Sequence, residues 1–341
     1  MYVFGIKEVG IDLGTSSVLI YQKGKGIVLR EPAVVAVDVH KGTAIATGYK
    51  AQRMLGRTPE HIKAVRPMRD GVISDYELTS KMLREFLRKA IKPGILGYKA
   101  VACVPSGVTE VEKRAVIDAV SQAGASRVRI IEEPIAAALG AGLDISKPNG
   151  SMVVDIGGGT TDIAILSLDG IVVRESIKVA GDKFDEAIVK YVKKKYNLLI
   201  GERTAEEAKL EIGCVLPMEE ERSFEVRGRC LITALPKTIE LTSTEMAEAT
   251  IETAMQIAEA VYSVLERTKP ELISDISQNG LVLTGGGSLI WGMDILLKQR
   301  TGIAALIAED SISCVAEGTG KALDYIESLP NEAQRKKIIY S

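Results

Sequence analysis

Apolar and polar positions follow the same order twice along the chain. Each half begins with runs of apolar, β-branched residues separated by short turns, the first over residues 9–21 and 26–37 and the second from Ser151 onward. Apolar residues then recur with helical spacing, as over residues 76–91. The pattern predicts two mixed α/β domains, each of which opens with a β-hairpin.

Helix starts are marked by three threonine–glutamate pairs that have the spacing of a capping box. The pairs are Thr109 with Glu112, Thr204 with Glu207, and Thr242 with Glu245. They predict helices over residues 110–123, 205–214 and 243–268. Further helices are predicted over 184–198, 288–300 and 314–328, and short strands over 99–105 and 281–284.

Two features of the sequence divide the chain. Residues 147–150, Lys-Pro-Asn-Gly, are the best candidate for a linker, because the strand and turn pattern restarts directly after them. Residues 38–70 are more polar and contain Gly and Pro, which indicates a smaller inserted region. A length of 341 residues also suits two domains of ordinary size. We expect a cleft between them.

Composition places the chain among soluble globular proteins, with 46% hydrophobic and 26% charged residues. The net charge of -2 gives no general attraction to anionic lipid or to nucleic acid, so no nucleic-acid partner is expected. Residues 1–4 run straight into a strand, which does not fit a signal peptide. No apolar run approaches the roughly 20 residues of a membrane-spanning helix. The expected compartment is the cytoplasm.

Cysteine and histidine usage argues against several kinds of site. The four cysteines are Cys103, Cys214, Cys230 and Cys314. They are scattered without a CxxC pair, so neither a disulfide framework nor a cysteine-based metal site is expected. The two histidines, His40 and His61, lie in polar, loop-like sequence. A catalytic triad and a histidine-based zinc site are therefore not expected either.

The main chemical signal is a turn that occurs twice. Residues 153–162 read Val-Val-Asp-Ile-Gly-Gly-Gly-Thr-Thr-Asp, and residues 10–16 read Gly-Ile-Asp-Leu-Gly-Thr-Ser. In both, an apolar strand delivers an aspartate, Asp155 or Asp12, to a turn that contains glycine. Two carboxylates that face each other across a cleft suit a hydrated Mg²⁺ that also binds phosphate. One such aspartate could simply cap its own turn, but two in the same context favour the metal.

The backbone amides of these turns can point at phosphate oxygens, because glycine lets the backbone approach closely. The candidate residues are Gly14, Thr15 and Ser16 in the first turn and Gly157, Gly158, Gly159 and Thr160 in the second. The sequence contains neither the P-loop motif nor the G-x-G-x-x-G fingerprint. It therefore indicates a phosphate site of another kind.

A third glycine turn, formed by Gly285, Gly286, Gly287 and Ser288, follows a strand and precedes a predicted helix. The N-terminus of such a helix favours an anion or a closely packed ribose or base. The alternative is a tight connection between strand and helix. With two phosphate turns present, the nucleoside contact is favoured.

Two groups of charged residues also suit a nucleotide site. Glu206, Lys209 and Gly213 share one helix face that could meet a ribose and an adenine, although a solvated salt-bridge face is the simpler explanation of such charges. Glu132 and Glu133 lie where a strand turns into a helix, and the helix dipole accounts for an acidic pair there. Alternatively, one of them orients a water for in-line attack on a terminal phosphate. Chemistry alone does not choose between the two glutamates.

Together these motifs resemble the actin-like ATPase superfamily, which includes actins, the seventy-kilodalton heat-shock chaperones and sugar kinases. The two Asp-x-Gly turns and the late Gly-Gly-Gly turn of that superfamily occur here in the same order. Over nearly the whole chain, the sequence is similar to the MreB family of bacterial actins. The matching runs are 24–26, 66–73, 131–138, 155–162, 180–182, 200–206 and 283–288. Two departures are Ser16-Ser17, where relatives usually have Ala-Asn, and Trp291, where Arg is usual.

The resemblance implies an α/β architecture of the actin-like ATPase fold, with two duplicated domains around a nucleotide cleft and a smaller subdomain on each. Domain I would comprise residues 1–149, with subdomain IB inserted at about 33–67, and would be completed by a C-terminal helix at about 314–341. Domain II would comprise residues 150–313, with subdomain IIB inserted at about 182–243.

The resemblance also implies a cytoskeletal ATPase that binds ATP with Mg²⁺ and hydrolyses it slowly. Such proteins polymerise into protofilaments, often paired, along the inner face of the cell membrane and determine cell shape, with membrane-anchored morphogenesis proteins as implied partners. The resemblance favours Glu133 as the residue that orients the attacking water, with Thr160 helping. It makes Gly181, Asp182, Glu206 and Lys209 nucleotide contacts.

Membrane contact is expected at residues 92–99, where some relatives carry a membrane-inserting loop. Ile95 and Leu96 are flanked there by lysines. Each buried aliphatic side chain would contribute only about 1.5–3 kcal/mol, so a monomer would bind weakly and a filament well. The alternative is that both side chains pack into the core. The basic tail at 335–339 is a second candidate, for which a disordered terminus is the simpler explanation.

Two other functions within the superfamily are alternatives. A small-molecule kinase of the sugar-kinase type would need a catalytic aspartate beside a substrate hydroxyl, and no motif indicates one. A chaperone-type ATPase would need a peptide-binding domain after the third glycine turn, but only about 50 residues follow Ser288. A filament-forming ATPase is therefore the leading hypothesis.

Overall fold

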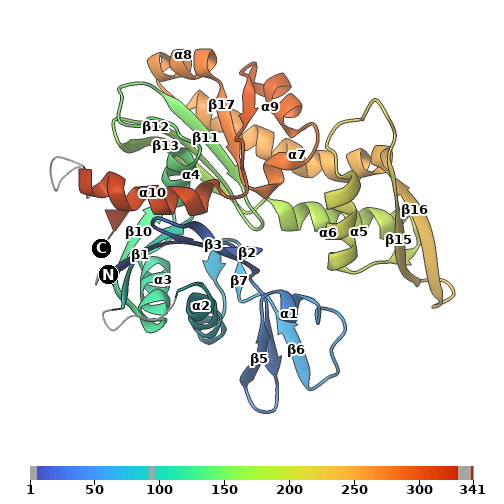
Figure 1. Cartoon of the computed structure of the whole chain (residues 1–341). Coiled ribbons are helices and arrows are strands. Elements are labelled where there is room, and N and C mark those ends of the chain that lie inside the picture. Colours follow the sequence, from blue (N-terminus) through green and yellow to red (C-terminus); the bar gives the residue numbers. More distant parts are fainter. Residues whose placement is uncertain (1–5, 92–96, 329–338, 341) are drawn as a thin grey trace.

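The computed structural model describes residues 6–91, 97–328 and 339–340. Two large domains lie one above the other in Figure 1, and each carries a smaller lobe on the same side of the molecule. No helix in the described ranges is long and apolar enough to cross a bilayer. The predicted arrangement of two mixed α/β domains is confirmed.

Domain I is built on a six-stranded sheet in the order β19-β10-β9-β1-β2-β3. Strands β1, β9 and β10 are parallel, while β2 and β3 extend from β1 as an antiparallel meander. The strands are β1 (Lys7–Leu13), β2 (Ser17–Gln22), β3 (Gly26–Pro32), β9 (Tyr98–Val104), β10 (Ala125–Glu132) and β19 (Ile339–Tyr340). Helices α2 (Tyr76–Ala90) and α3 (Glu110–Gln122) pack their apolar residues against one face of this sheet.

Domain II repeats this plan in a five-stranded sheet, in the order β13-β12-β11-β17-β18. Strands β11, β12 and β13 form the antiparallel meander, and β17 and β18 run parallel to β11. The strands are β11 (Ser151–Ile156), β12 (Thr161–Ser167), β13 (Gly170–Ile177), β17 (Leu281–Thr284) and β18 (Ala305–Ile307), and the helices are α7 (Ser243–Glu266), α8 (Pro270–Asn279) and α9 (Met293–Thr301). The duplication predicted from the repeated turn is therefore present in the topology.

Each domain carries an insert with a small sheet. In subdomain IB the elements are β4 (Val35–Asp38), β5 (Thr43–Thr47), α1 (Tyr49–Gln52) and β6 (Ile62–Val65), followed by the short pair β7 (Met68–Arg69) and β8 (Val72–Ile73). In subdomain IIB they are α5 (Gly181–Tyr196), β14 (Leu198–Leu199), α6 (Glu202–Ile212), β15 (Ser223–Cys230) and β16 (Pro236–Thr242). Each insert has its own hydrophobic cluster, which is much the larger in subdomain IIB.

Helices α4 (Glu133–Gly140) and α10 (Cys314–Ser328) join the two domains at the centre (Figure 1). Their buried residues pack with side chains of both large sheets. The two backbones touch at glycines: a Cβ on Gly318 would lie 1.7 Å from the Ala136 carbonyl oxygen, and one on Gly140 would lie 1.8 Å from that of Cys314. Only glycine allows this close approach.

The structure confirms two of the three predicted capping boxes, at Thr109 and at Thr242. The capping box predicted at Thr204 is wrong. Helix α6 begins at Glu202, with the extended Gly201 at its N-cap, so Thr204 lies inside the helix. The helix predicted over residues 288–300 is also wrong at its start. The glycine turn enters a short 3₁₀ helix, η1 (Gly286–Leu289), and Gly292 at φ 83° separates η1 from α9.

Candidate functional site

The two repeated turns are closed by equivalent backbone hydrogen bonds. In turn 1 (residues 14–16) the Gly14 amide donates to the Ser17 carbonyl at 3.1 Å, and in turn 2 (residues 157–160) the Gly157 amide donates to the Thr160 carbonyl at 2.9 Å. Turn 1 joins β1 to β2, and turn 2 joins β11 to β12. Each is thus the tip of the hairpin that opens its domain, which is why one sequence pattern describes both.

Turn 1 and turn 2 meet across the cleft. A Cβ on Gly158 would lie 2.1 Å from Ser16 Oγ, and one on Gly159 would lie 2.5 Å from Thr15 Oγ1. Residues 158 and 159 must therefore lack a side chain for the two turns to approach this closely.

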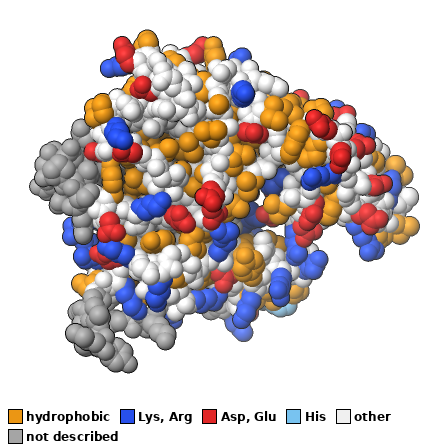
Figure 2. Space-filling model, turned by 45° about the horizontal axis from the view of Figure 1, so that its top comes forward, with side chains coloured by type: hydrophobic (Ala, Val, Ile, Leu, Met, Phe, Trp, Pro, Cys, Tyr) orange, Lys and Arg blue, Asp and Glu red, His pale blue; other side chains and the backbone are white. Residues whose placement is uncertain are grey.

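A cavity of about 510 Å³ lies between the two domains, which is the size of a small-molecule site. Figure 2 shows a hollow between the large domains with charged side chains on its rim. Most of the predicted site residues line the cavity. They are Asp12, Gly14, Thr15, Ser16, Glu133, Asp155, Gly157, Gly158, Gly159, Thr160, Gly181, Glu206, Lys209, Gly285, Gly286 and Gly287.

Asp12 and Asp155 reach this cavity from the equivalent strands β1 and β11. Asp155 accepts a hydrogen bond of 2.6 Å from Thr284 Oγ1, while Asp12 contacts the Cys103 thiol at 3.5 Å. Burial, reinforced by the charge of Asp155, raises the pKa of Asp12 to about 7. Burial also raises the pKa of Asp155 to about 6. Two crowded carboxylates of this kind fit a divalent cation, which would relieve their repulsion.

The structure separates the two adjacent glutamates. Glu132 accepts hydrogen bonds from Arg174 at 2.7 Å and from Ser106 Oγ at 2.9 Å, so its charge is held in an internal ion pair. Glu133, the first residue of α4, lines the cavity instead. Burial, followed by repulsion from Asp162, raises the pKa of Glu133 well above its usual range. A carboxylate with a raised pKa that lines a cavity is suited to accept a proton from water.

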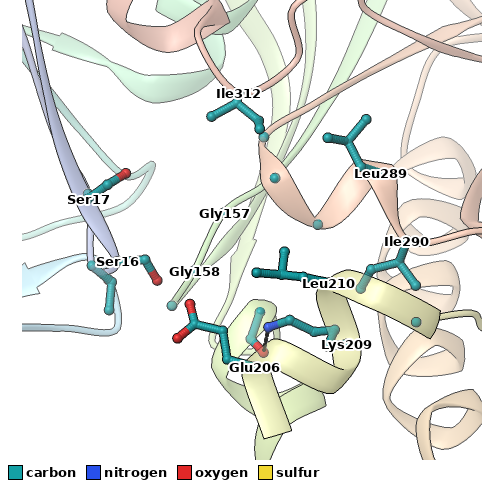
Figure 3. A pocket seen from close by; sticks show the side chains of 18 of the residues that line it. Ser16, Ser17, Gly157, Gly158, Glu206, Lys209, Leu210, Leu289, Ile290 and Ile312 are labelled. Carbon is teal, nitrogen blue, oxygen red and sulfur yellow. Dashed lines mark hydrogen bonds between the residues drawn. The ribbon is translucent and has the colours of Figure 1, made fainter. Parts of the chain in front are cut away.

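Helix α6 supplies the outer wall of the cavity. Glu206 and Lys209 point from it toward turn 2 and the start of α5 (Figure 3). Lys209 Nζ is held 3.0 Å from the Gly181 carbonyl and 2.9 Å from the carboxylate of Asp185. Glu206 lies 3.5 Å from a guanidinium nitrogen of Arg66, which reaches across from subdomain IB. The predicted polar face of α6 is therefore turned into the cleft rather than left as an isolated solvent-exposed face.

Sequence reasoning missed the apolar part of the cavity. Leu210, Leu289, Ile290 and Ile312 converge from α6, η1 and the segment before α10 (Figure 3). Leu210 is 75% exposed and Leu289 is 54% exposed, so apolar surface of both side chains is open to a ligand in the cavity. Their positions directly after Lys209 and Ser288 were the available signal. Such a wall suits the flat, apolar faces of a nucleobase.

Two of the predicted contacts are placed differently. Ser288 is fully buried and its hydroxyl donates to the Gly285 carbonyl at 2.7 Å, so it supports the third glycine turn from behind. Asp182 is not among the residues that line the cavity, and it pairs with Arg66 at 3.3 Å. Ile95 and Leu96, predicted to contact a membrane, lie outside the described residues.

Two duplicated α/β domains that bring paired aspartate and glycine turns to one cleft define an actin-like protein. Comparison with known sequences agrees, since the MreB/Mbl protein family model matches residues 6–331. The chain therefore belongs to the MreB/Mbl family, which confirms the resemblance stated from its motifs.

Individual relatives cover almost the entire chain. It is 50% identical over 330 residues to the cell shape-determining protein Mbl of Bacillus cereus, covering 96% of this chain and 99% of that one. It is 49% identical over 326 residues to the cell shape-determining protein MreB of Escherichia coli strain K12, covering 94% of each. The crystal structure of MreB5 of Spiroplasma citri bound to AMPPNP superposes with a TM-score of 0.90 at 39% identity, covering 94% of this chain and 97% of that one.

Proposed function

We propose that this protein is a cytoskeletal ATPase that binds ATP with Mg²⁺, hydrolyses it slowly, and assembles with copies of itself into filaments that determine cell shape. The observation that carries the proposal is the meeting of turn 1 and turn 2, each with its own aspartate, in one cavity between two duplicated domains. Among relatives, MreB5 of Spiroplasma citri has been solved with AMPPNP and with ADP.

In this proposal Asp12 and Asp155 hold the Mg²⁺, and the amides of turn 1 and turn 2 bind the phosphates. The bound ion supplies positive charge to the phosphate oxygens. Glu206 and Lys209 contact the ribose end of the nucleotide, and Gly285, Gly286 and Gly287 let the adenosine approach the backbone. The apolar wall that includes Leu210 and Leu289 then covers the base.

Hydrolysis requires a water placed in line with the terminal phosphate. Glu133 and Thr160 both line the cavity and are the groups proposed to orient that water. As the water oxygen bonds to the γ-phosphorus and the bond to the leaving oxygen of ADP breaks, Glu133 accepts the proton of the water. The raised pKa of Glu133 suits this step, although positioning carries most of the rate in phosphoryl transfer.

Two exposed apolar regions on separate sheets of domain II support head-to-tail assembly. The turn between β15 and β16 exposes Leu231, Ile232 and Leu235 at 42%, 78% and 64%. Hydrophobic side chains are visible among charged ones at this outer end of the molecule (Figure 2). The edge strand β18 exposes Leu306 and Ile307 at 51% and 42%. When two such different surfaces of one chain join, the contact repeats from copy to copy, and it forms a filament where the rotation between copies does not close a ring.

Membrane association at the inner face of the cell membrane, and contact with membrane-anchored morphogenesis proteins, complete the proposal. They rest on membership of a family whose relatives are named cell shape-determining proteins. Weak contacts by each monomer would add up along a filament.

Pelleting with ATP and Mg²⁺, with phosphate release measured in parallel, tests the whole proposal. We expect concentration-dependent pelleting that requires nucleotide and is enhanced by liposomes. A protein that stays monomeric at high concentration, with and without lipid, would contradict filament formation.

Replacement of Glu133 tests the catalytic assignment. Glu133→Ala should retain ATP binding and slow phosphate release by about 100-fold, because the water loses its orienting carboxylate. The measurement is single-turnover phosphate release at saturating ATP. An unchanged rate of phosphate release would show that a group other than Glu133 orients the water.

A further inference from the structure

A second pocket lies outside the nucleotide cleft, between subdomain IB and helix α2. We call it the IB–α2 groove. It has a volume of about 460 Å³ and is lined by Thr43, Ala44 and Thr47 of β5 and by Lys81, Arg84, Glu85 and Arg88 of α2. The α2 residues recur at intervals of three and four, which places them on one face of the helix. Lys and Arg side chains gather along the lower edge of the molecule in Figure 2, where α2 and subdomain IB lie.

The positive charge of the IB–α2 groove is only partly balanced. Its single acid, Glu85, pairs with Lys89 at 3.5 Å. Lys81 lies 4.0 Å from Glu77, the edge of ion-pair distance. Arg84 and Arg88 are exposed, and neither forms a hydrogen bond or ion pair with any residue in the described part of the chain. Two unpaired guanidinium groups one helical turn apart can converge on one anion.

Thr47 provides an independent observation. It is 2% exposed, and its Oγ1 is buried without a hydrogen-bond partner among the described residues. A buried hydroxyl without a partner is unfavourable, and most such groups in folded proteins are paired. Because Thr47 also lines the groove, a rotation of its side chain about χ1 would let the hydroxyl donate to an anion held there.

We propose that the IB–α2 groove is a binding site for a phosphate-type oxyanion, held by Arg84, Arg88 and the Thr47 hydroxyl. Arginine presents two parallel N–H groups that match the oxygens of a phosphoryl group. The bound anion would link β5 of subdomain IB to α2 of domain I and so fix the position of the small subdomain. This proposal does not depend on ATP binding in the cleft.

The test is a titration of the nucleotide-free full chain with inorganic phosphate, followed by backbone amide NMR shifts. We expect saturable shifts at residues 43–47 that are separate from any shifts at turn 1 and turn 2. Arg84→Gln with Arg88→Gln should weaken this binding by about 10-fold or more, because two charge-assisted hydrogen bonds are lost. Lys190→Gln with Lys194→Gln is the matched control, since these are two exposed cations with the same spacing on α5. No shifts at 43–47, or equal affinity in both double variants, would overturn the proposal.

Thr47→Val removes the hydroxyl without changing the shape of the side chain. We expect about 3- to 10-fold weaker phosphate binding and an unchanged or higher melting temperature without phosphate. A clear fall in the melting temperature would show that the Thr47 hydroxyl is already hydrogen-bonded within the fold. The hydroxyl would then not be a ligand of the anion.

Vesicle co-sedimentation distinguishes the two sources of a phosphoryl group. If Arg84→Gln with Arg88→Gln reduces binding to phosphatidylglycerol vesicles, and the lysine control does not, the ligand is a lipid headgroup. If the two double variants sediment equally while phosphate binding differs, the ligand is a soluble phosphate. Phosphatidylcholine vesicles supply the background.

Discussion

Turn 1 and turn 2 share one backbone hydrogen bond, but the surrounding chain holds them differently. The Thr15 hydroxyl of turn 1 accepts a hydrogen bond of 2.9 Å from the Gly71 amide, and the Ser16 carbonyl accepts one of 2.9 Å from Ala33. In turn 2 the carbonyls of Gly157 and Gly158 accept from the first amides of α5, at 3.1 and 2.8 Å. Turn 1 therefore depends partly on a side chain, while turn 2 is anchored through its backbone.

The partners of each turn lie at the borders of a small subdomain. Ala33 and Gly71 flank subdomain IB, and α5 begins subdomain IIB. Each turn is thus bonded to the point where its own insert leaves or rejoins the large domain. We infer that a displacement of either small subdomain is transmitted to the turn of the same domain, through a side chain and the backbone in turn 1 and through the backbone alone in turn 2.

The largest expected effect comes from adding a side chain to turn 2. In Gly159→Ala the new Cβ would lie 2.5 Å from Thr15 Oγ1 and 3.0 Å from the Asp70 amide nitrogen, so turn 1 and turn 2 would be forced apart. ATP binding should weaken by about 100-fold, a loss of roughly 3 kcal/mol. Titration with a fluorescent ATP analogue measures it. Gly157→Ala is the control, because its Cβ would be 3.3 Å from its nearest neighbour, the Thr160 carbonyl. An equal loss of ATP affinity in Gly159→Ala and Gly157→Ala would show that the close contact between turn 1 and turn 2 is not what ATP binding requires.

The pH dependence of Mg²⁺ binding should separate the two aspartates. Their folded-state pKa values are raised, to about 7 for Asp12 and about 6 for Asp155, so both bind protons as the pH falls toward 6. Mg²⁺ must displace those protons, and nucleotide affinity at limiting Mg²⁺ should fall about 10-fold between pH 8 and pH 6. In Asp12→Asn the remaining transition should lie near pH 6. A transition that stays near pH 7 would assign the higher pKa to another group.

The smallest expected effect concerns the side-chain anchor of turn 1. Thr15→Val removes the acceptor of the Gly71 amide and should lower the free energy of unfolding by about 1 kcal/mol. Thr15→Ser keeps the oxygen and should restore most of this loss. Urea unfolding of the nucleotide-free protein measures both variants. If Thr15→Val is as stable as the parent chain, turn 1 does not rely on this bond.

Local features of the sequence predicted most of the polar residues that line the cavity between the two domains. A strand, an aspartate and a glycine turn are contiguous, so their chemistry can be read without knowing the fold, and the same holds for the capping boxes at Thr109 and Thr242. The threonine–glutamate spacing at Thr204 was misleading, because an extended Gly201 lets α6 begin before it.

The remainder of the site depends on contacts that are distant in sequence. Leu210 and Leu289 become one wall only when α6 and η1 are brought together. Arg66 faces Glu206 across 140 positions of the chain, and no local pattern links them. The Ser288 hydroxyl could have faced either the cavity or its own turn, and the fold directs it to Gly285.

The position of Glu133 at the start of α4 has a consequence for how far its carboxylate moves when the cleft opens. Helix α4 is pressed against α10 at the centre of the molecule, and the glycine contacts leave no side chain between the two backbones. If the domains rotate about this pair of helices, atoms far from the axis travel further than atoms close to it. Turn 1 and turn 2 would then move through longer arcs than Glu133. We therefore expect that turn 1 and turn 2 can separate while the Glu133 carboxylate stays near its place.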